Sequence, residues 1–257
     1  MKTILTIFLG LFITVNFATA QDTLYVYKAG AVAYKSVISA VDSVTFQKVY
    51  VPPTSVTDID GNVYKIVSIG TQTWMAENLK TTKYRDGSAI PNIVDNALWY
   101  HATTDGWCDF FNLPTNGTKL GHLYNWYAVI DSRNIAPAGW HVPTDAEWTT
   151  LINYLGGVGL AEGKLKEAGT LNWPSPNDMA TNSSGFSAIP SGMKDGNDFN
   201  WMGENGRSYR VFWWSTTPDP TNSEGLPFLW YLDSNYNFVG RTLSYFTMGN
   251  SVRCIKD

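Results

Sequence analysis

The stretch that decides the fold of this chain is Gly139-Trp140-His141-Val142-Pro143-Thr144-Asp145-Ala146-Glu147-Trp148. Thr144 is a favourable N-cap residue, and Glu147, three residues later, completes the pattern of a capping box. Apolar residues then recur at helical spacing, at Trp148, Leu151, Ile152 and Leu155, and Gly156-Gly157 follows as a stop signal. The sequence therefore predicts a helix over 144–155 that packs one apolar face on a core.

The composition around this helix is that of an extracellular β-rich protein. Charged residues make up 16% of the 257 residues, below the usual quarter or so, and all eleven tryptophans lie at or after Trp74. The polar surface must then consist largely of Asn, Ser, Thr and Gly. The net charge of −4 provides no basic field, so nucleic acid and anionic membranes are not expected partners.

The N-terminus has the pattern of a secretory signal peptide over residues 1–20. Met1-Lys2 gives the positive start, residues 4–17 are apolar, and Ala18-Thr19-Ala20 matches a cleavage site. The apolar run is shorter than the roughly 20 residues that span a bilayer, so the mature protein is expected to be soluble and not membrane-spanning. Periplasm, cell surface and medium all remain open as its final location.

Three segments follow the signal peptide. Residues 21–47 are predicted to form a small β-hairpin unit, with strands at 24–28 and 31–38 and a further β-prone run at 41–46. Residues 48–55 contain Pro52-Pro53 and are predicted to be a stiff linker. Residues 56–257 form the main domain. Within it, Asp60-Gly61-Asn62 predicts a hairpin turn, residues 91–121 are expected to be mostly loop, and a second helix is expected across 162–168.

Several motifs of the main domain occur together in a known family. They are Gln72-Thr73-Trp74-Met75-Ala76-Glu77-Asn78-Leu79-Lys80, Tyr124-Asn125-Trp126-Tyr127-Ala128-Val129, Ser184-Gly185-Phe186-Ser187-Ala188, Trp213-Trp214-Ser215-Thr216 and Ser251-Val252-Arg253-Cys254-Ile255. With the opening stretch, they make residues 56–257 resemble the Fibrobacter succinogenes major paralogous domain family. The residue 22–46 unit is similar to leader segments of exported Bacteroidetes proteins.

The resemblance implies a particular fold. The family is similar to C-type-lectin-like domains, in the branch that also holds formylglycine-generating enzymes. We therefore expect an α+β fold with twisted antiparallel sheets, one or two helices and long loops, preceded by the small N-terminal β unit. Formylglycine-generating enzymes hold copper with two cysteines five residues apart. Cys254 matches the second of these, but Gly249 stands in place of the first, so the resemblance does not carry a copper site over.

The two cysteines, Cys108 and Cys254, are therefore assigned another role. In an oxidising compartment an even pair usually forms a bridge, so a Cys108–Cys254 disulfide is predicted, with two free thiols as the alternative.

The histidines and the acidic motifs of the sequence predict no cofactor. His101, His122 and His141 do not have the spacing of a helical zinc pair. Asp58-Ile59-Asp60-Gly61-Asn62 begins like a calcium loop, but Ile69 occupies the twelfth position, so a hairpin is preferred. A structural calcium ion in the loops remains the open alternative.

The candidate ligand-binding residues lie between 207 and 241. If 210–216 is a strand, Trp213 and Trp214 face opposite sides, and one of them is expected to face a groove or an overlying loop. Phe228, Trp230 and Leu232 are expected to share one face of the next strand. The predicted set is Arg207, Trp213, Trp214, Tyr231, Asp233 and Arg241, in which an exposed tryptophan stacks on a sugar or anchors a protein. The alternative is that loops cover these side chains.

These observations predict an exported, non-catalytic recognition or surface-structural module that binds glycan or a surface protein through aromatic and Asn/Asp groups. No complete catalytic constellation is present in the sequence. The alternative is a divergent thiol- or metal-dependent enzyme related to formylglycine-generating enzymes. A third interpretation is an architectural subunit whose 22–46 strands pair with a neighbour.

Overall fold

The computed structural model divides into two compact units, residues 1–52 and residues 53–257, which are described separately. It describes the backbone of four strands between residues 6 and 37, and residues 54–196, 198–200 and 208–257. The first unit is an antiparallel sheet in the order β1-β2-β3-β4, formed by β1 (Thr6–Phe8), β2 (Phe12–Asn16), β3 (Thr23–Lys28) and β4 (Ala31–Val37).

Strands β3 and β4 occupy the ranges expected for a hairpin. Strands β1 and β2 lie inside the segment that the sequence assigns to a signal peptide, which stays a prediction. The β-prone run at 41–46 and most of the predicted linker, residues 48–53, lie outside the described residues.

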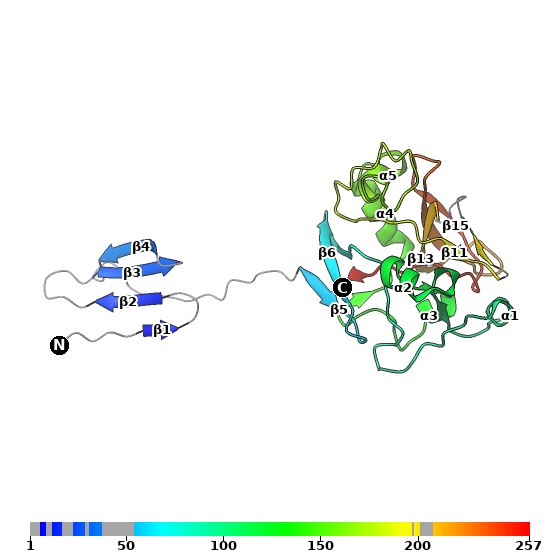
Figure 1. Ribbon diagram of the computed structural model, residues 1–257, viewed down its shortest axis with the longest axis horizontal. Helices are drawn as coiled ribbons and strands as arrows, with labels where there is room; N and C mark the ends of the chain where they lie inside the picture. The colour runs from blue at the N-terminus through cyan, green and yellow to red at the C-terminus, as the bar shows by residue number, and fades with distance from the viewer. Residues whose placement is uncertain are drawn as a thin grey trace. The chain divides into compact units, whose positions relative to one another are not determined.

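The second unit is a mixed α/β domain with antiparallel strand pairs and few helices (Figure 1), which confirms the expected sheet type. Its first sheet has the strand order β10-β16-β7-β6-β5. The C-terminal strand thus lies between β7 and β10 and ties the end of the domain to its beginning. The strands are β5 (Ser55–Thr57), β6 (Val63–Ile69), β7 (Gln72–Met75), β10 (Trp140–His141) and β16 (Ile255–Lys256).

The turn between β5 and β6 is the predicted hairpin. Gly61 adopts φ +86°, a conformation that glycine tolerates without steric cost. The Asp58 carboxylate accepts hydrogen bonds from the backbone amides of Asp60 and Asn62 and from the Tyr64 hydroxyl. Asp58 therefore uses its oxygens to shape the turn.

The helix predicted from the opening stretch is α4 (Asp145–Tyr154), and its capping box is confirmed. The Thr144 hydroxyl accepts from the Glu147 backbone amide, and the Glu147 carboxylate accepts from the Thr144 backbone amide at 2.8 Å. Trp148, Leu151 and Ile152 are buried on its inner face. A second helix, α5 (Val158–Leu165), starts earlier than the expected 162–168 because the chain turns directly after Gly156-Gly157. The two helices lie next to each other (Figure 1).

The second sheet has the order β13-β14-β15, formed by β13 (Arg210–Pro218), β14 (Pro227–Asp233) and β15 (Gly240–Leu243). Each of its faces packs in a different hydrophobic cluster. Val211, Trp213, Trp230 and Leu232 join the cluster that contains α4, whereas Phe212, Trp214, Leu229 and Tyr231 pack in or against the cluster that contains Tyr64 and Cys254. The sheet is therefore covered on both sides.

The segment expected to be loop, 91–121, contains short helices instead. Asp95 caps the first through its side chain, and Pro114 occupies the first turn of another, where a missing N–H costs nothing. The remaining elements are α1 (Asn96–Tyr100), β8 (Trp107–Cys108), the 3-10 helix η2 (Phe110–Asn112), α2 (Pro114–Leu120), β9 (Leu123–Tyr124), α3 (Trp126–Val129), β11 (Met193–Lys194) and β12 (Phe199–Asn200).

Candidate ligand-binding cleft

A cleft of about 560 Å³ opens between the β5–β6 turn, strand β8 and helix α2. Its volume falls within the roughly 300–1,000 Å³ range typical of small-molecule sites. Most of the residues that line it have polar side chains, and the rings of Trp107 and His122 are among them. The lining residues include Asn62, Asn92, Trp107, Asp109, Asn112, Gly117 and His122.

Trp107 is half-buried and contributes its ring to the cleft. Its ring centroid lies 4.1 Å from that of His122, and its Nε1 donates to the Ile90 carbonyl at 3.0 Å. Strands β8 and β9 pair with Trp107 opposite Tyr124. Because His122 is two residues before Tyr124, it lies on the same face as Trp107, and the sheet register brings the two rings together.

Asp109 and His122 both line the cleft and form a partly buried pair. The His122 Nδ1 and the Asp109 Oδ1 are 2.7 Å apart, and Nδ1 carries the hydrogen because a carboxylate oxygen only accepts. Burial lowers the pKa of His122, and the opposing effect of the Asp109 carboxylate does not reverse this. A Cβ at Gly117 would lie 1.8 Å from the Asp109 Oδ1, so only glycine leaves room for the pair.

Three asparagines line the cleft with amide nitrogens that are already bonded to the protein. Asn62 Nδ2 donates to Asp58, Asn92 Nδ2 to the Trp107 carbonyl, and Asn112 Nδ2 to the Val94 carbonyl. These bonds fix the orientation of each amide. The buried Oδ1 of Asn112 has no hydrogen-bond partner in the structure. The cleft therefore holds polar groups in fixed positions beside an indole ring.

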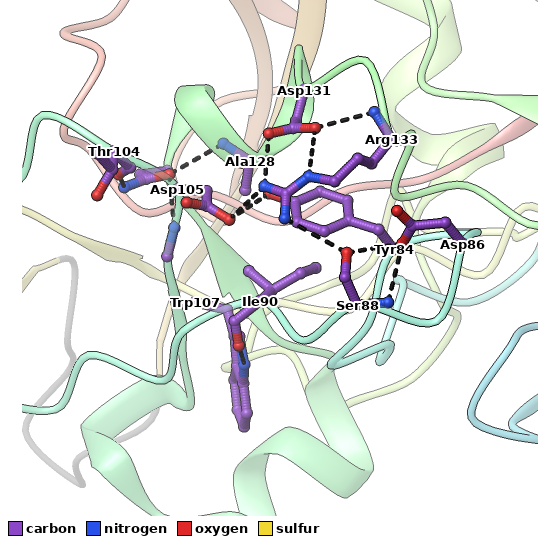
Figure 2. Close-up of polar contacts among 12 residues, drawn as sticks. Tyr84, Asp86, Ser88, Ile90, Thr104, Asp105, Trp107, Ala128, Asp131 and Arg133 are labelled. Atoms are coloured by element: carbon purple, nitrogen blue, oxygen red, sulfur yellow. Dashed lines mark hydrogen bonds and ion pairs between the residues drawn. The ribbon is translucent and has the colours of Figure 1, made fainter.

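An ion-pair network centred on Arg133 supports the loop that precedes β8 and Trp107 (Figure 2). The Arg133 guanidinium donates to both Asp131 oxygens at 2.8 and 2.7 Å and to Asp105 at 3.1 Å, and it lies 4.0 Å from the centre of the Tyr84 ring. The Tyr84 hydroxyl also donates to Asp105. In Figure 2 the Trp107 indole points away from this network. Asp105 is thus held two residues before Trp107, which fixes where the indole enters the cleft.

The two tryptophans that the sequence suggests as ligand contacts do not form an open site. Trp213 and Trp214 do face opposite sides of β13, but neither is exposed. Trp213 Nε1 donates to the Asn78 side-chain oxygen at 2.9 Å, and Trp214 Nε1 donates to the Tyr124 carbonyl at 2.7 Å. Neither tryptophan faces a groove, and the alternative that these side chains are covered holds, because the sheet has a hydrophobic cluster on each side.

The other predicted ligand residues also have structural partners. Asp233 is fully buried and forms an ion pair with Arg210. Arg241 binds both oxygens of Asp145 at 2.7 Å, at the start of α4. Tyr231 is half-buried, and its ring lies over Gly240. Arg207 lies outside the described residues. The structure therefore does not bring this set together around one open surface.

The disulfide predicted between Cys108 and Cys254 is absent from the structure, where both thiols are free and buried. Cys108 packs with Trp99 and Phe110, whereas Cys254 packs with Tyr64 and Tyr124 in another cluster. Burial raises the pKa of both thiols. Within the described residues, no group of three or more His, Cys, Asp or Glu side chains is placed to hold a metal ion.

Sequence reasoning did not find the cleft. In the sequence His122 is one of three histidines without metal-site spacing, and Trp107 and Asp109 lie in a segment expected to be loop. The one available signal is the pair of short β-prone runs at 107–108 and 123–124, and their register cannot be read from so few residues.

Fold and site together define a mixed α/β domain with a preformed cleft. A family model described as the Fibrobacter succinogenes major domain matches residues 67–256. The chain belongs to this family, which confirms the resemblance seen in the sequence. No curated protein and no solved structure matches the chain. Of the helices that the structure describes, none has both the length and the apolar character needed to cross a membrane.

Proposed function

We propose that this protein is an exported, non-catalytic recognition module whose cleft binds a glycan. The observation that carries the proposal is the half-buried Trp107 ring, held beside fixed asparagine amides and the Asp109–His122 pair in one cleft. Export is proposed from the signal-peptide pattern of residues 1–20, and a C-type-lectin-like fold from the family resemblance.

The chemistry of the cleft suits a sugar. An indole offers a flat apolar surface to the C–H face of a pyranose ring. Amide and imidazole groups both donate and accept hydrogen bonds, as sugar hydroxyls require. Because the amides and the Arg133-supported loop are already fixed, binding would cost little side-chain ordering.

The state of the two thiols favours recognition over the thiol-dependent alternative. A thiolate is the form that acts as nucleophile or metal ligand. Cys108 and Cys254 are buried, and burial raises the pKa of each. Both are therefore protonated and shielded from solvent near neutral pH.

A glycan array tests the proposal with wild type, Trp107→Ala and Asn92→Ala. Asn153→Ala serves as the matched control, since Asn153 is exposed on α4 and does not line the cleft. We expect wild type and the control to bind the same glycans and the two cleft variants to lose them. Circular dichroism of each variant checks folding. Absence of any glycan bound by wild type, or equal binding by all four proteins, contradicts the proposal.

A further inference from the structure

The hairpin loop between β14 and β15 presents two aromatic rings to solvent. Tyr236 is 49% exposed and Phe238 is 39% exposed, and their ring centroids are 5.4 Å apart with an interplanar angle of 39°. Asn235 and Asn237, which alternate with them, are exposed as well. The loop therefore shows solvent a short alternation of amides and aromatic rings.

This loop is anchored by hydrogen bonds at both ends. The Ser234 backbone amide donates to the Tyr209 carbonyl at 2.9 Å, and the Asn235 amide donates to the Asp233 carboxylate at 2.8 Å. At the far end, the Val239 amide donates to the Val158 carbonyl of α5 at 2.9 Å. The sequence suggests Asp233 as a ligand contact, but its carboxylate is buried in an ion pair with Arg210. It also accepts the hydrogen bond from Asn235 and so holds the start of this loop.

We propose that Tyr236 and Phe238 form a second glycan contact, which stacks on the sugar rings of a neutral polysaccharide. Two neighbouring exposed rings on an anchored loop offer apolar faces at little entropic cost. Asn235 and Asn237 add hydrogen-bonding groups that match sugar hydroxyls. The proposal shares only its ligand class with the cleft and uses none of the cleft residues.

The sequence of the loop favours a glycan over a lipid surface. Residues 234–240 contain no Lys or Arg, whereas attraction to anionic lipid headgroups depends on basic side chains beside the apolar ones. A polysaccharide that reached both the loop and the cleft would bind with avidity, because the second contact becomes intramolecular.

Binding of the full chain to suspensions of cellulose, chitin and insoluble xylan tests the proposal. The variants are Tyr236→Ala, Phe238→Ala and the double substitution, with Tyr245→Ala as control because Tyr245 is 59% exposed elsewhere. We expect each single variant to bind one of these polysaccharides about 2- to 10-fold more weakly, as an aromatic contact of this kind implies. The control should match wild type.

Parallel measurements separate this proposal from the cleft proposal. If only Trp107→Ala loses binding and the loop variants do not, the loop proposal is overturned and the cleft proposal stands. If only the loop variants lose binding, the loop contact is supported, and the glycan array decides the cleft proposal separately. Wild-type binding to phosphatidylcholine–phosphatidylglycerol vesicles and to none of the polysaccharides overturns the loop proposal in favour of a lipid surface.

Discussion

The fully buried Arg253 donates hydrogen bonds from Nε and Nη2 to the side-chain oxygen of Asn78, at 3.2 and 2.9 Å. The same oxygen accepts from Trp213 Nε1, and Arg253 Nη1 donates to the Phe186 carbonyl. Burial lowers the pKa of Arg253 to about 9, against the opposing effect of Glu77. One neutral amide thus joins β13, the C-terminal segment and the segment after β7.

Replacing Asn78 with Ala should strongly destabilise the domain. The substitution leaves the Arg253 guanidinium and the Trp213 indole N–H without their shared acceptor, and a buried donor left without a partner costs about 1–3 kcal/mol, and more when the donor is charged. The midpoint of urea unfolding, followed by circular dichroism, measures the loss. Arg253→Met removes the charge together with its need for a partner, so its loss should be smaller. A urea midpoint of Asn78→Ala equal to that of wild type would contradict the role assigned to the Asn78 side-chain oxygen.

The substitution Gly117→Ala should disturb the cleft while Gly159→Ala should not. A Cβ at Gly117 would lie 1.8 Å from the Asp109 Oδ1 and 2.8 Å from His122 Cε1, whereas one at Gly159 in α5 would meet nothing within 4 Å. We expect Gly117→Ala to lose about 1–3 kcal/mol through overpacking. Gly159→Ala should gain up to about 1 kcal/mol from helix propensity. Urea unfolding compares the two, and equal effects of the same sign would refute the role assigned to Gly117.

Neither cysteine should react in the native protein. Both thiols are buried and their pKa values are raised by burial, so little thiolate is available. Titration with a thiol-specific chromogenic reagent, without reductant, should detect no thiol in buffer and both thiols in concentrated urea. Detection of none in urea would show that the protein carries the disulfide after all.

The His141 ring should link stability to pH through α4 and the C-terminus. Its Nε2 and Nδ1 lie 2.8 Å from Glu147 and 2.6 Å from Asp257. Although burial favours the neutral ring, these carboxylates raise the pKa of His141 above its usual 6.5. The stabilisation is therefore complete below about pH 6.5 and is lost as the pH rises through the folded-state pKa.

Melting temperatures at about pH 5.5 and about pH 8.5 test this linkage. Burial acts to raise the pKa of Glu147, but hydrogen bonds from Thr144 and His141 outweigh it and hold the pKa below its usual 4.5. The stabilisation that comes from the Glu147 carboxylate is therefore lost only at more acidic pH than this test covers. Wild type should lose more stability than His141→Gln on going to the higher pH. His101→Gln should follow wild type. Identical pH dependence in wild type and His141→Gln would rule the linkage out.

The fold could be predicted from sequence wherever the signal is local. Thr144 and Glu147 define a helix start by themselves, and Gly61 supports a hairpin turn with its positive φ. Trp213 and Trp214 show where local reasoning ends. Alternation along the strand is local, but whether a face is covered depends on segments far away in the chain, here Asn78 and Tyr124.

The candidate cleft was beyond sequence reasoning for the same physical cause. Trp107 and His122 meet through a strand pair only two residues long. Such a pair has no periodicity to detect, and the Arg133 network that places the loop depends on carboxylates 2 and 28 residues from Arg133. The predicted Cys108–Cys254 bridge is absent because the two thiols lie in different hydrophobic clusters. An even number of cysteines and an oxidising compartment give no information about which cluster each thiol joins.

The alternation of side chains along strand β13 restricts where residues can be inserted into or deleted from this domain. Its neighbouring residues serve different hydrophobic clusters, so one inserted or deleted residue would exchange the two sets of side chains and disrupt both clusters at once. The 219–226 turn that follows has no such constraint. Length variation, and any engineered insertion, should therefore be tolerated in this turn and not within residues 210–216.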